Sequence, residues 1–300
     1  MNMESITEAL AEDVERSIRK HGWSAEHNYW HYQYDKAKDE QNIFFLYEDD
    51  MGILASYSQK TNTWTMFSEV LAPEERRLGV FLQFLEHVLS EKKGKKVVVE
   101  LESSFRDAVL EAIKGKYHAA KPTMVLTWPL FDMAQWDPTL PGGEWKKLRN
   151  IINTFYREHK VEVMPSTEVP FPKLKAILDA WKQNRPKEDR TYSSHYLNAI
   201  KANFKGYDMT RTLVVDGEPC SITGGWKVPN SGTYYSAFGL HNYKYDRLGE
   251  VTNIDDLNEL KRRGHAWVDF GGSDGNLLEF KKKFRPHRYY DTITFSIRSP

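Results

Sequence analysis

WVDFGGSDGNLLEFKKKFRP, residues 267–286, is the stretch around which the chain is organised. Residues 267–270 have the apolar character of a short buried strand, and the glycine pair 271–272 follows as a turn. A helix is expected to open near residues 273–274 and to end before Pro286. A strand that enters a helix through such a turn leaves backbone N–H groups unpaired at the helix N-terminus, where they can hold an anion.

Three consecutive lysines, residues 281–283, lie on this predicted helix. Successive helical residues point about 100° apart, so the three ammonium groups cannot share one face. One of them can turn inward toward the strand ends, while the others lie on a solvated face. The sequence therefore offers a cation close to the glycine turn.

The length, the net charge and the cysteine count limit the possible classes of protein. The 300 residues suffice for one large domain or two ordinary ones, and Lys+Arg and Asp+Glu are both 42. Zero net charge argues against binding of nucleic acid or an anionic membrane over a broad basic surface, although a local basic groove remains compatible with it. The single cysteine, Cys220, excludes an intrachain disulfide and a cysteine-based zinc cluster, which fits a reducing compartment.

Targeting signals are not found in the sequence. The first 22 residues lack the apolar region of a signal peptide, and no apolar run reaches the roughly 18 residues of a membrane span. His27 and His31 lie among tyrosines and tryptophans without a pattern of partnering carboxylates, so we interpret them as packing residues rather than metal ligands. We expect a cytoplasmic protein without a metal site.

The first half of the chain mixes strands and helices. The predicted elements are an amphipathic helix over 4–21, strands over 42–47, 52–59 and 63–70, a long helix after Pro73, a buried strand over 96–101, a helix over 105–114 and a strand over 124–130. Residues 131–144 then interrupt the periodicity with two prolines and a Gly-Gly pair. We place a domain boundary there.

The second half repeats this order of elements. Its predicted helices and strands are a helix over 145–159, a short strand over 160–164, helices over 170–183 and 194–204, strands over 210–215, 220–228 and 233–239, a helix over 248–264, the strand and helix of the opening stretch, and a strand over 289–297. Antiparallel hairpins joined to helical crossovers give a mixed sheet. We therefore predict two α/β units, 1–135 and 145–300.

The first half resembles the GNAT acyltransferase fold. In that family an R/Q-x-x-G-x-G/A segment before the long helix holds the pyrophosphate of coenzyme A on its backbone amides. RRLGVF, residues 76–81, keeps Arg76 and Gly79, but Phe81 stands where glycine or alanine belongs. Because a bulky side chain blocks close approach of the backbone to a phosphate, we expect the N-terminal copy to be degenerate for cofactor binding.

The second half resembles a more particular family. WKKLRNIINTF, residues 145–155, is similar to the K-x-L-R-N-x-x-N-x-F helix of the phosphatidylglycerol lysyltransferase C-terminal domain family, whose members are tandem GNAT-like folds. VDFGG, residues 268–272, followed by Phe280 and Lys281, is similar both to that family and to the Fem peptidyltransferases. The resemblance implies a tandem GNAT-like α/β fold for the whole chain.

Acyl transfer is the activity that the resemblance implies, often of an aminoacyl group from aminoacyl-tRNA to an amine or a hydroxyl. Aminoacyl-tRNA or acyl-CoA would act as co-substrate, with no permanently bound cofactor, and the acceptor stays open. The lysine of the F-K motif carries over to Lys281, where it would steady charge on the carbonyl or phosphate of the donor. Phe280 would stack or pack beside it.

Elementary chemistry adds a general base to this list. Acyl transfer builds an oxyanion, which a preorganised cation or N–H pair stabilises by roughly 3–4 kcal/mol, and Lys281 is our candidate for that role. The attacking group must also lose a proton. Asp269 at the strand end is our first candidate base, followed by Asp274 and Glu250. The alternative for Asp269 is a helix cap or an ion-pair partner.

Candidate phosphate ligands lie in two segments. Lys146 and Arg149 belong to the 145–155 motif, and an arginine fork suits phosphate, although an ion pair is the alternative for Arg149. HNYKYDRLG, residues 241–249, lies where the second copy should carry its phosphate loop. It keeps Arg247 and Gly249 without the GNAT spacing, which leaves room for another phosphate-bearing donor such as the tRNA terminus.

A second class of function competes with the enzyme. A duplicated fold that has lost catalysis would be a binding module for a peptide, a lipid head group or a nucleic acid. The joint presence of Asp269, Phe280, Lys281 and Arg149 favours the transferase. The transferase hypothesis requires Lys281 and a carboxylate to face a common cleft, and a Lys281 that points into bulk solvent would refute its catalytic role.

Overall fold

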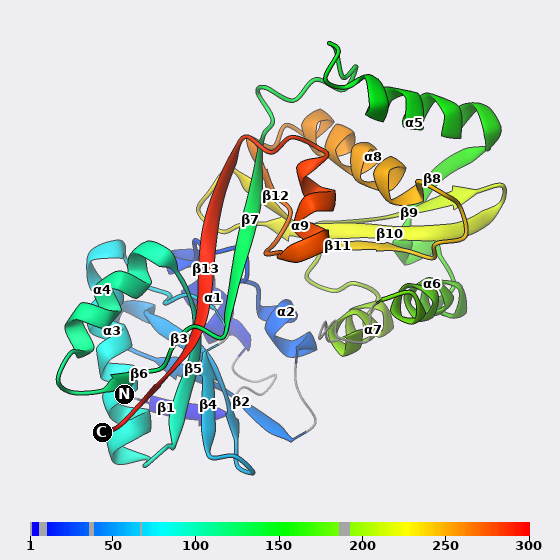
Figure 1. Ribbon diagram of the computed structural model, residues 1–300. Coiled ribbons are helices and arrows are strands. Elements are labelled where there is room, and N and C mark those ends of the chain that lie inside the picture. The colour runs from blue at the N-terminus through cyan, green and yellow to red at the C-terminus, as the bar shows by residue number, and fades with distance from the viewer. Residues whose placement is uncertain (1, 6–10, 36–38, 67, 186–192) are drawn as a thin grey trace.

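The computed structural model describes residues 2–5, 11–35, 39–66, 68–185 and 193–300. This part of the chain builds one thirteen-stranded mixed sheet with the strand order β1-β2-β3-β4-β5-β13-β7-β12-β11-β10-β9-β8, and β6 pairs with β13 off this path. Figure 1 shows the two halves of the chain at opposite ends of the molecule, joined by the long strands β7 and β13.

The first half contains the predicted elements in the predicted order, together with three short elements that the sequence did not predict, at residues 2–5, 29–34 and 118–119. Its elements are β1 (Asn2–Ser5), α1 (Ala11–His21), α2 (Tyr29–Tyr34), β2 (Glu40–Leu46), β3 (Gly52–Ser58), β4 (Thr63–Met66), α3 (Glu74–Leu85), β5 (Lys96–Glu102), α4 (Ser103–Ile113), β6 (His118–Ala119) and β7 (Met124–Asp132). Of the helix expected over 4–21, Ala11–His21 is helical, and residues 6–10 lie outside the described residues. Residues 2–5 instead pair antiparallel with β2, whose edge satisfies their backbone hydrogen bonds.

The second half also matches its prediction in order and nearly in bounds. Its elements are α5 (Lys146–Glu158), β8 (Val161–Pro165), α6 (Phe171–Gln183), α7 (Ser193–Lys201), β9 (Met209–Val215), β10 (Glu218–Lys227), β11 (Thr233–His241), α8 (Leu248–Arg262), β12 (Trp267–Asp269), α9 (Gly275–Lys282) and β13 (Arg288–Arg298). Part of the loop expected after α6 lies outside the described residues. The α/β class with a large mixed sheet is confirmed.

Helices cover both faces of the sheet. In β2 and β3, Phe45 and Ile53 pack into a core with α3 and α4, whereas Phe44 and Leu54 point to the opposite face and pack against α1 and α2. Strands covered on both faces have little polar sequence, which explains their continuous apolar runs. In the second half, α5 and α8 cover one face while α6 and α7 cover the other.

The two halves exchange strands. β13, the last strand of the chain, lies between β5 and β7, and its Phe295 and Ile297 are buried in the core of the first half. β7 in turn pairs with β12, and its Phe131 packs in the core of the second half. A division of the sequence into 1–135 and 145–300 therefore separates strands that share one sheet.

The segment that resembles a coenzyme A loop is helical. Residues 76–81 lie inside α3, which starts at Glu74 directly after Pro73. Phe81 is fully buried and packs against Phe84 and Phe105. The GNAT resemblance places this segment before the long helix, but Pro73 starts the helix at Glu74, and the backbone amide of Arg77 already donates to the Pro73 carbonyl.

Candidate active site

Asp269 ends β12 with its carboxyl group buried and held by two donors. The side chain is only 3% exposed. Its Oδ1 accepts the backbone N–H of Gly271 at 2.7 Å, and its Oδ2 accepts the Tyr290 hydroxyl at 2.8 Å. Burial raises the pKa of Asp269 to about 6, although both hydrogen bonds and nearby Lys281 favour the carboxylate. A carboxyl group with this pKa can exchange a proton near neutral pH.

Glycine is required at the two positions after Asp269 for two different physical reasons. Gly271 adopts φ +77°, a left-handed conformation that favours glycine. Gly272 has no positive φ, but a Cβ atom there would lie 2.8 Å from Cε2 of Trp128 and 3.0 Å from Cβ of Leu126. The turn is thus fixed by backbone conformation at one glycine and by close packing against β7 at the other.

Lys281 turns its ammonium group back toward the end of β12. Its Nζ donates to the carbonyl of Phe270 at 2.5 Å and to that of Gly271 at 3.0 Å. Burial lowers its pKa to about 8, while Asp269 acts in the opposite direction. Lys281 therefore does not point into bulk solvent, the outcome that would have refuted its catalytic role. It is not among the described residues that line the cavity beside Asp269, so the cleft shared with a carboxylate, which the transferase hypothesis requires, stays a prediction.

The other two lysines of this run form ion pairs at the surface. Lys282 lies 2.7 Å from Glu279 on its own helix, and Lys283 lies 2.9 Å from Glu250 on α8. The 100° turn between successive helical residues thus separates one buried ammonium from two solvated ones, as the sequence indicates. The contact with Glu250 links α9 to the N-terminus of α8.

The start of α8 lies against α9, so the structure brings several predicted residues together. A Cβ at Gly249 would lie 3.1 Å from the ring of His241 and 3.3 Å from that of Phe280. Burial lowers the pKa of His241 to about 4. Arg247 precedes the helix with φ +65° and pairs with Asp246 at 3.2 Å. Gly249 and Glu250 at the start of α8 therefore lie against Phe280 and Lys283 of α9, with Arg247 directly before α8, whereas the Lys281 ammonium points to the end of β12.

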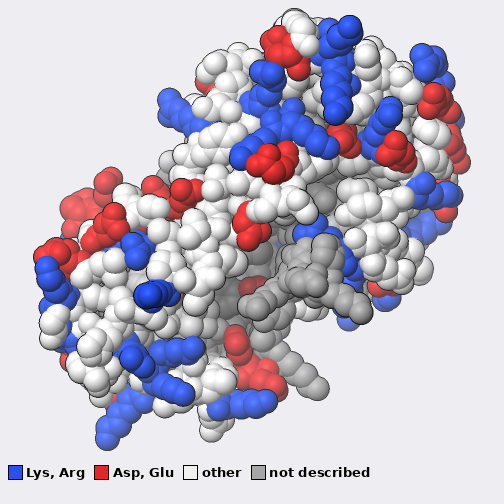
Figure 2. All heavy atoms as spheres, viewed as in Figure 1, with Lys and Arg blue, Asp and Glu red and all other residues white. Residues whose placement is uncertain are grey.

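Three other predicted residues are placed differently. The Arg149 guanidinium donates to the carbonyls of Leu140 and Gly142, so it ties α5 to the loop before it. Lys146 is exposed at the start of α5. Asp274 is exposed at the N-cap position of α9, where its side chain makes no capping hydrogen bond. Figure 2 shows basic side chains over this half of the molecule, interspersed with acidic ones.

Asp269 also lines a cavity between the two halves of the chain. The cavity has a volume of about 350 Å³, and we call it the acidic cavity because five carboxyl side chains line it: Glu26, Glu69, Glu100, Glu102 and Asp269. Trp23, Trp128 and Tyr290 are among its other lining residues. No lysine, arginine or histidine is among the described residues that line it.

Sequence reasoning missed most of this cavity. Glu26, Glu69 and Glu100 are far apart in the chain, and only the exchange of strands brings them to Asp269. One signal was present in the sequence: Glu100 interrupts the apolar residues of the run KVVVEL, residues 96–101. A carboxylate in a buried strand costs free energy unless it has a partner, so it indicates a polar site. The Oε1 atom of Glu100 accepts the Thr292 hydroxyl at 2.5 Å.

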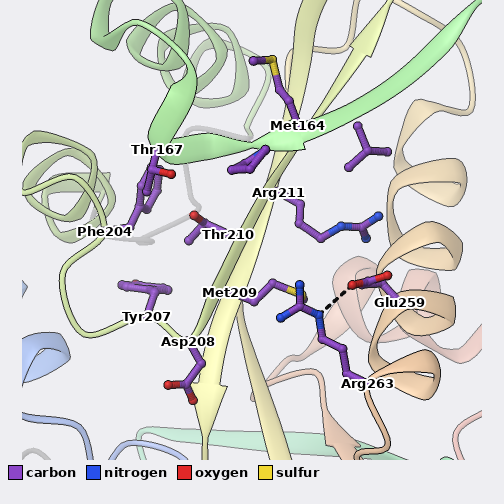
Figure 3. Close-up of a pocket in the computed structure, with 12 residues that line it drawn as sticks. Met164, Thr167, Phe204, Tyr207, Asp208, Met209, Thr210, Arg211, Glu259 and Arg263 are labelled. Carbon is purple, nitrogen blue, oxygen red and sulfur yellow. Dashed lines mark hydrogen bonds and ion pairs between the residues drawn. The ribbon is translucent and has the colours of Figure 1, made fainter.

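A second, larger cavity of about 480 Å³ lies between β8, β9 and the end of α8 (Figure 3). Three of its four charged side chains form ion pairs, and the fourth, Asp208, accepts the backbone N–H of Lys227 at 2.6 Å. Arg263 contacts Glu259 at 2.7 Å, as the dashed line in Figure 3 marks, and Arg211 contacts Asp255 at 2.7 Å. None of the predicted site residues lines it, so we centre the candidate active site on the turn after β12.

Comparison with solved structures defines the class of fold. A tandem GNAT protein from the clavulanic acid biosynthesis pathway superposes with a TM-score of 0.57 at 10% identity, over 99% of this chain and 98% of that chain. FemX superposes with a TM-score of 0.61 at 10% identity, over 97% of each chain. The chain therefore has the tandem GNAT fold.

The family follows from the sequence itself. Residues 36–292 match the family described as phosphatidylglycerol lysyltransferase, C-terminal, and this chain belongs to that family. L-PGS from Bacillus licheniformis superposes with a TM-score of 0.70 at 16% identity, over 98% of this chain and 93% of that chain. A search of curated proteins finds no match.

Proposed function

We propose that this protein is an acyltransferase that moves an aminoacyl group from aminoacyl-tRNA to an amine or hydroxyl acceptor. The observation that carries the proposal is the buried Asp269 carboxyl at the end of β12 with the Lys281 ammonium held on the carbonyls of Phe270 and Gly271 directly after it, in a chain of the phosphatidylglycerol lysyltransferase C-terminal family. Acyl-CoA is the competing donor. Because aminoacyl-tRNA is a cytoplasmic molecule, the proposal places the reaction in the cytoplasm. Within the described residues, none of the helices combines the length and the apolar character that crossing a bilayer requires.

In this reaction the nitrogen or oxygen of the acceptor attacks the ester carbonyl carbon of the donor. The bond to the ribose oxygen breaks, and the tRNA leaves with a proton on that oxygen, which Asp269 returns after it has taken one from the acceptor. Asp269 and Tyr290 both line the acidic cavity, and the Tyr290 hydroxyl already donates to Asp269. An acceptor in the cavity would pass its proton to Tyr290 as Tyr290 passes its own to Asp269.

Lys281 would stabilise the oxyanion of the tetrahedral intermediate. An ammonium group has three N–H donors, and the carbonyls of Phe270 and Gly271 take two of them. The third can point at the developing charge. A preorganised donor of this kind contributes about 3–4 kcal/mol to a transition state, which corresponds to a factor of about 10²–10³ in rate.

The test is a transfer assay with tRNA charged with radiolabelled lysine or alanine. Acceptors would be phosphatidylglycerol vesicles and small primary amines, and labelled acetyl-CoA would be run beside them. We expect Lys281→Ala to lower the transfer rate from charged tRNA by about 10²–10³-fold. The matched control is Lys282→Ala, which removes an exposed ion pair from the same helix and should leave the rate within about twofold.

Circular dichroism and the unfolding midpoint of each variant separate catalysis from folding. Unchanged transfer by a folded Lys281→Ala variant would refute the catalytic role. Transfer from acetyl-CoA alone would replace the proposed donor. No transfer from either donor to any acceptor, together with binding of charged tRNA, would favour the non-catalytic binding module.

A further inference from the structure

The acidic cavity contains a buried carboxylate oxygen without a partner. Glu69 is 7% exposed. Its Oε1 accepts the backbone N–H of Glu102 at 2.7 Å, whereas its Oε2 is buried and has no hydrogen-bond partner in the part of the chain that the structure describes. Buried carboxyl oxygens are normally hydrogen-bonded, so an unpartnered one that lines a cavity points to a donor that enters the cavity.

The neighbours of Glu69 add further carboxyl groups to the same cavity. Glu26, whose pKa is raised well above its usual range by burial, interacts unfavourably with Glu69, Glu100 and Asp269. Glu102 and Glu100 act on Glu69 in the same sense and, with burial as the main cause, raise its pKa to about 8.

The cations and histidines nearby are already engaged. The Arg77 guanidinium is the cation that acts on Glu69, but it lies 3.8 Å from the centre of the Trp23 ring and donates to the carbonyl of Ala72. His27 uses Nδ1 to accept two backbone N–H groups and Nε2 to donate to the Glu69 carbonyl. Burial lowers the pKa of His27 to about 4, so it is neutral.

The lining of the cavity also includes aromatic surface. Trp128 stacks on Tyr290 with ring centres 5.4 Å apart, and Trp23 lines the same cavity. Ring faces attract cations and pack against alkyl chains. A volume of about 350 Å³ is roughly ten times the share of one water molecule in the liquid, so it admits a chain of several carbon atoms. In the described ranges, no three His, Cys, Asp or Glu side chains are placed to share one metal ion.

We propose that the acidic cavity is a binding site for a primary alkylammonium group, which Glu69 and Glu26 hold as carboxylates while Trp23 and Trp128 contact its alkyl part. The site does not depend on the transfer reaction. The ammonium group belongs either to an amine acceptor or to the aminoacyl group of the donor, and both carry the same chemistry. Binding should release protons, because a cation in the cavity stabilises carboxylates that are otherwise protonated.

Isothermal titration calorimetry of the full chain tests the site directly. The probes at pH 7.5 are pentylammonium chloride, lysine amide, pentanol and calcium chloride. We expect both amines to bind and pentanol and calcium not to bind. Titrations in two buffers of different ionisation enthalpy should show proton release on amine binding.

Two variants and one control complete the test. Glu69→Gln keeps an acceptor for the Glu102 N–H but removes the charge, and Glu26→Gln removes the charge on the opposite segment; each should weaken amine binding at least tenfold. Glu111→Gln on α4, an exposed glutamate that pairs with Lys114 at 3.7 Å, makes the same chemical change away from the cavity and should bind normally. The unfolding midpoint verifies that each variant folds.

Several results would overturn the proposal. These are no amine binding at tens of millimolar, equal binding of pentanol, calcium that binds and displaces the amine, or unchanged amine binding in both Gln variants. The transfer assay, run with pentylamine added, then identifies the source of the ammonium group. If labelled lysyl-pentylamine forms, the cavity is an acceptor site. If pentylamine inhibits transfer without forming this product, the cavity binds the ammonium group of the donor. Absence of all transfer would refute the proposed function and leave the binding result valid.

Discussion

Asp269 and Lys281 have opposite charges, and burial shifts the pKa of each toward neutrality. The pKa of Asp269 is raised to about 6 and that of Lys281 is lowered to about 8, in both cases chiefly by loss of water. A base and an acid poised on either side of pH 7 are characteristic of catalytic sites, although structural pairs can show the same shifts.

This pair predicts a bell-shaped pH profile for transfer. The rate should rise as pH passes about 6, because Asp269 must be deprotonated to act as a base, and fall as pH passes about 8, because Lys281 must stay protonated. The measurement is kcat/KM for transfer between pH 5 and 9.5. Lys281→Arg, which stays charged throughout, should lose the alkaline limb; an alkaline limb that persists in this variant would assign it to another group.

Glu69 makes a separate prediction about stability. Its pKa in the folded state, about 8, lies above that of an unfolded glutamate. The protonated form of Glu69 therefore makes its full contribution to the free energy of unfolding at low pH, and this contribution is lost as the pH rises toward and through 8. One pKa unit is worth about 1.4 kcal/mol, so Glu69→Gln should be more stable than the wild type by more than about 1 kcal/mol at pH 8.5.

The measurement is the free energy of unfolding from urea titrations at pH 8.5 and at pH 3. At pH 3 the two proteins should differ little, since Glu69 is then protonated in both the folded and the unfolded state. Glu111→Gln should show no such pH-dependent gain. A Glu69→Gln variant that is less stable than the wild type at pH 8.5 would indicate that an ionised Glu69 is stabilised in the free protein.

At the scale of elements, the turn between β12 and α9 depends on its contact with β7. β12 has only three residues, and Gly272 directly after it packs against the ring of Trp128. The Trp128 Nε1 donates to Thr292 at 2.8 Å, and Thr292 donates to Glu100. The turn, the two long strands and the acidic cavity are therefore coupled through one tryptophan.

Gly272→Ala should destabilise the protein by about 1–3 kcal/mol, the usual cost of overpacking. The physical reason is the 2.8 Å approach of a new Cβ to Trp128, which the opposed strands prevent from moving freely. The control is Gly79→Ala in α3, where a Cβ meets no atom within 4 Å and alanine should stabilise the helix by about 0.5–1 kcal/mol. Thermal and urea unfolding would measure both; equal effects of the two substitutions would contradict the packing argument.

At the scale of the whole molecule, neither half of the sequence contains a complete sheet. Residues 145–300 include β13, which pairs with β5 and β7 of the first half, and they lack β7, which pairs with β12. The first half in turn needs Phe295 and Ile297 in its core. The two GNAT-like units that we predicted as 1–135 and 145–300 should therefore depend on each other for folding.

Expression of residues 145–300 alone tests this dependence. The fragment should show no cooperative unfolding transition, because β12 and β13 would expose unpaired edges and apolar side chains. Adding residues 1–144 in trans should restore a transition. A cooperative transition in the isolated fragment would show that the second unit folds by itself.

The sequence alone determined the order of the elements, the duplicated α/β architecture and the turn with Asp269, Phe280 and Lys281. These features are local: periodicity, glycine turns and the rotation between successive helical residues act within about twenty positions. The errors were local as well, at residues 2–5 and 76–81, where a sheet edge and an early helix start prevailed.

Only the tertiary structure decided which carboxylates share a cavity and which strands complete each half. Glu26, Glu69 and Glu100 meet Asp269 because β13 runs between β5 and β7, and nothing in the local pattern of any of these segments specifies that pairing. Strand pairing between distant segments is chosen by the burial of whole sheet faces, a property of the assembled molecule. The same cause explains why the acidic cavity, unlike the lysine beside the glycine turn, could not be predicted from the sequence.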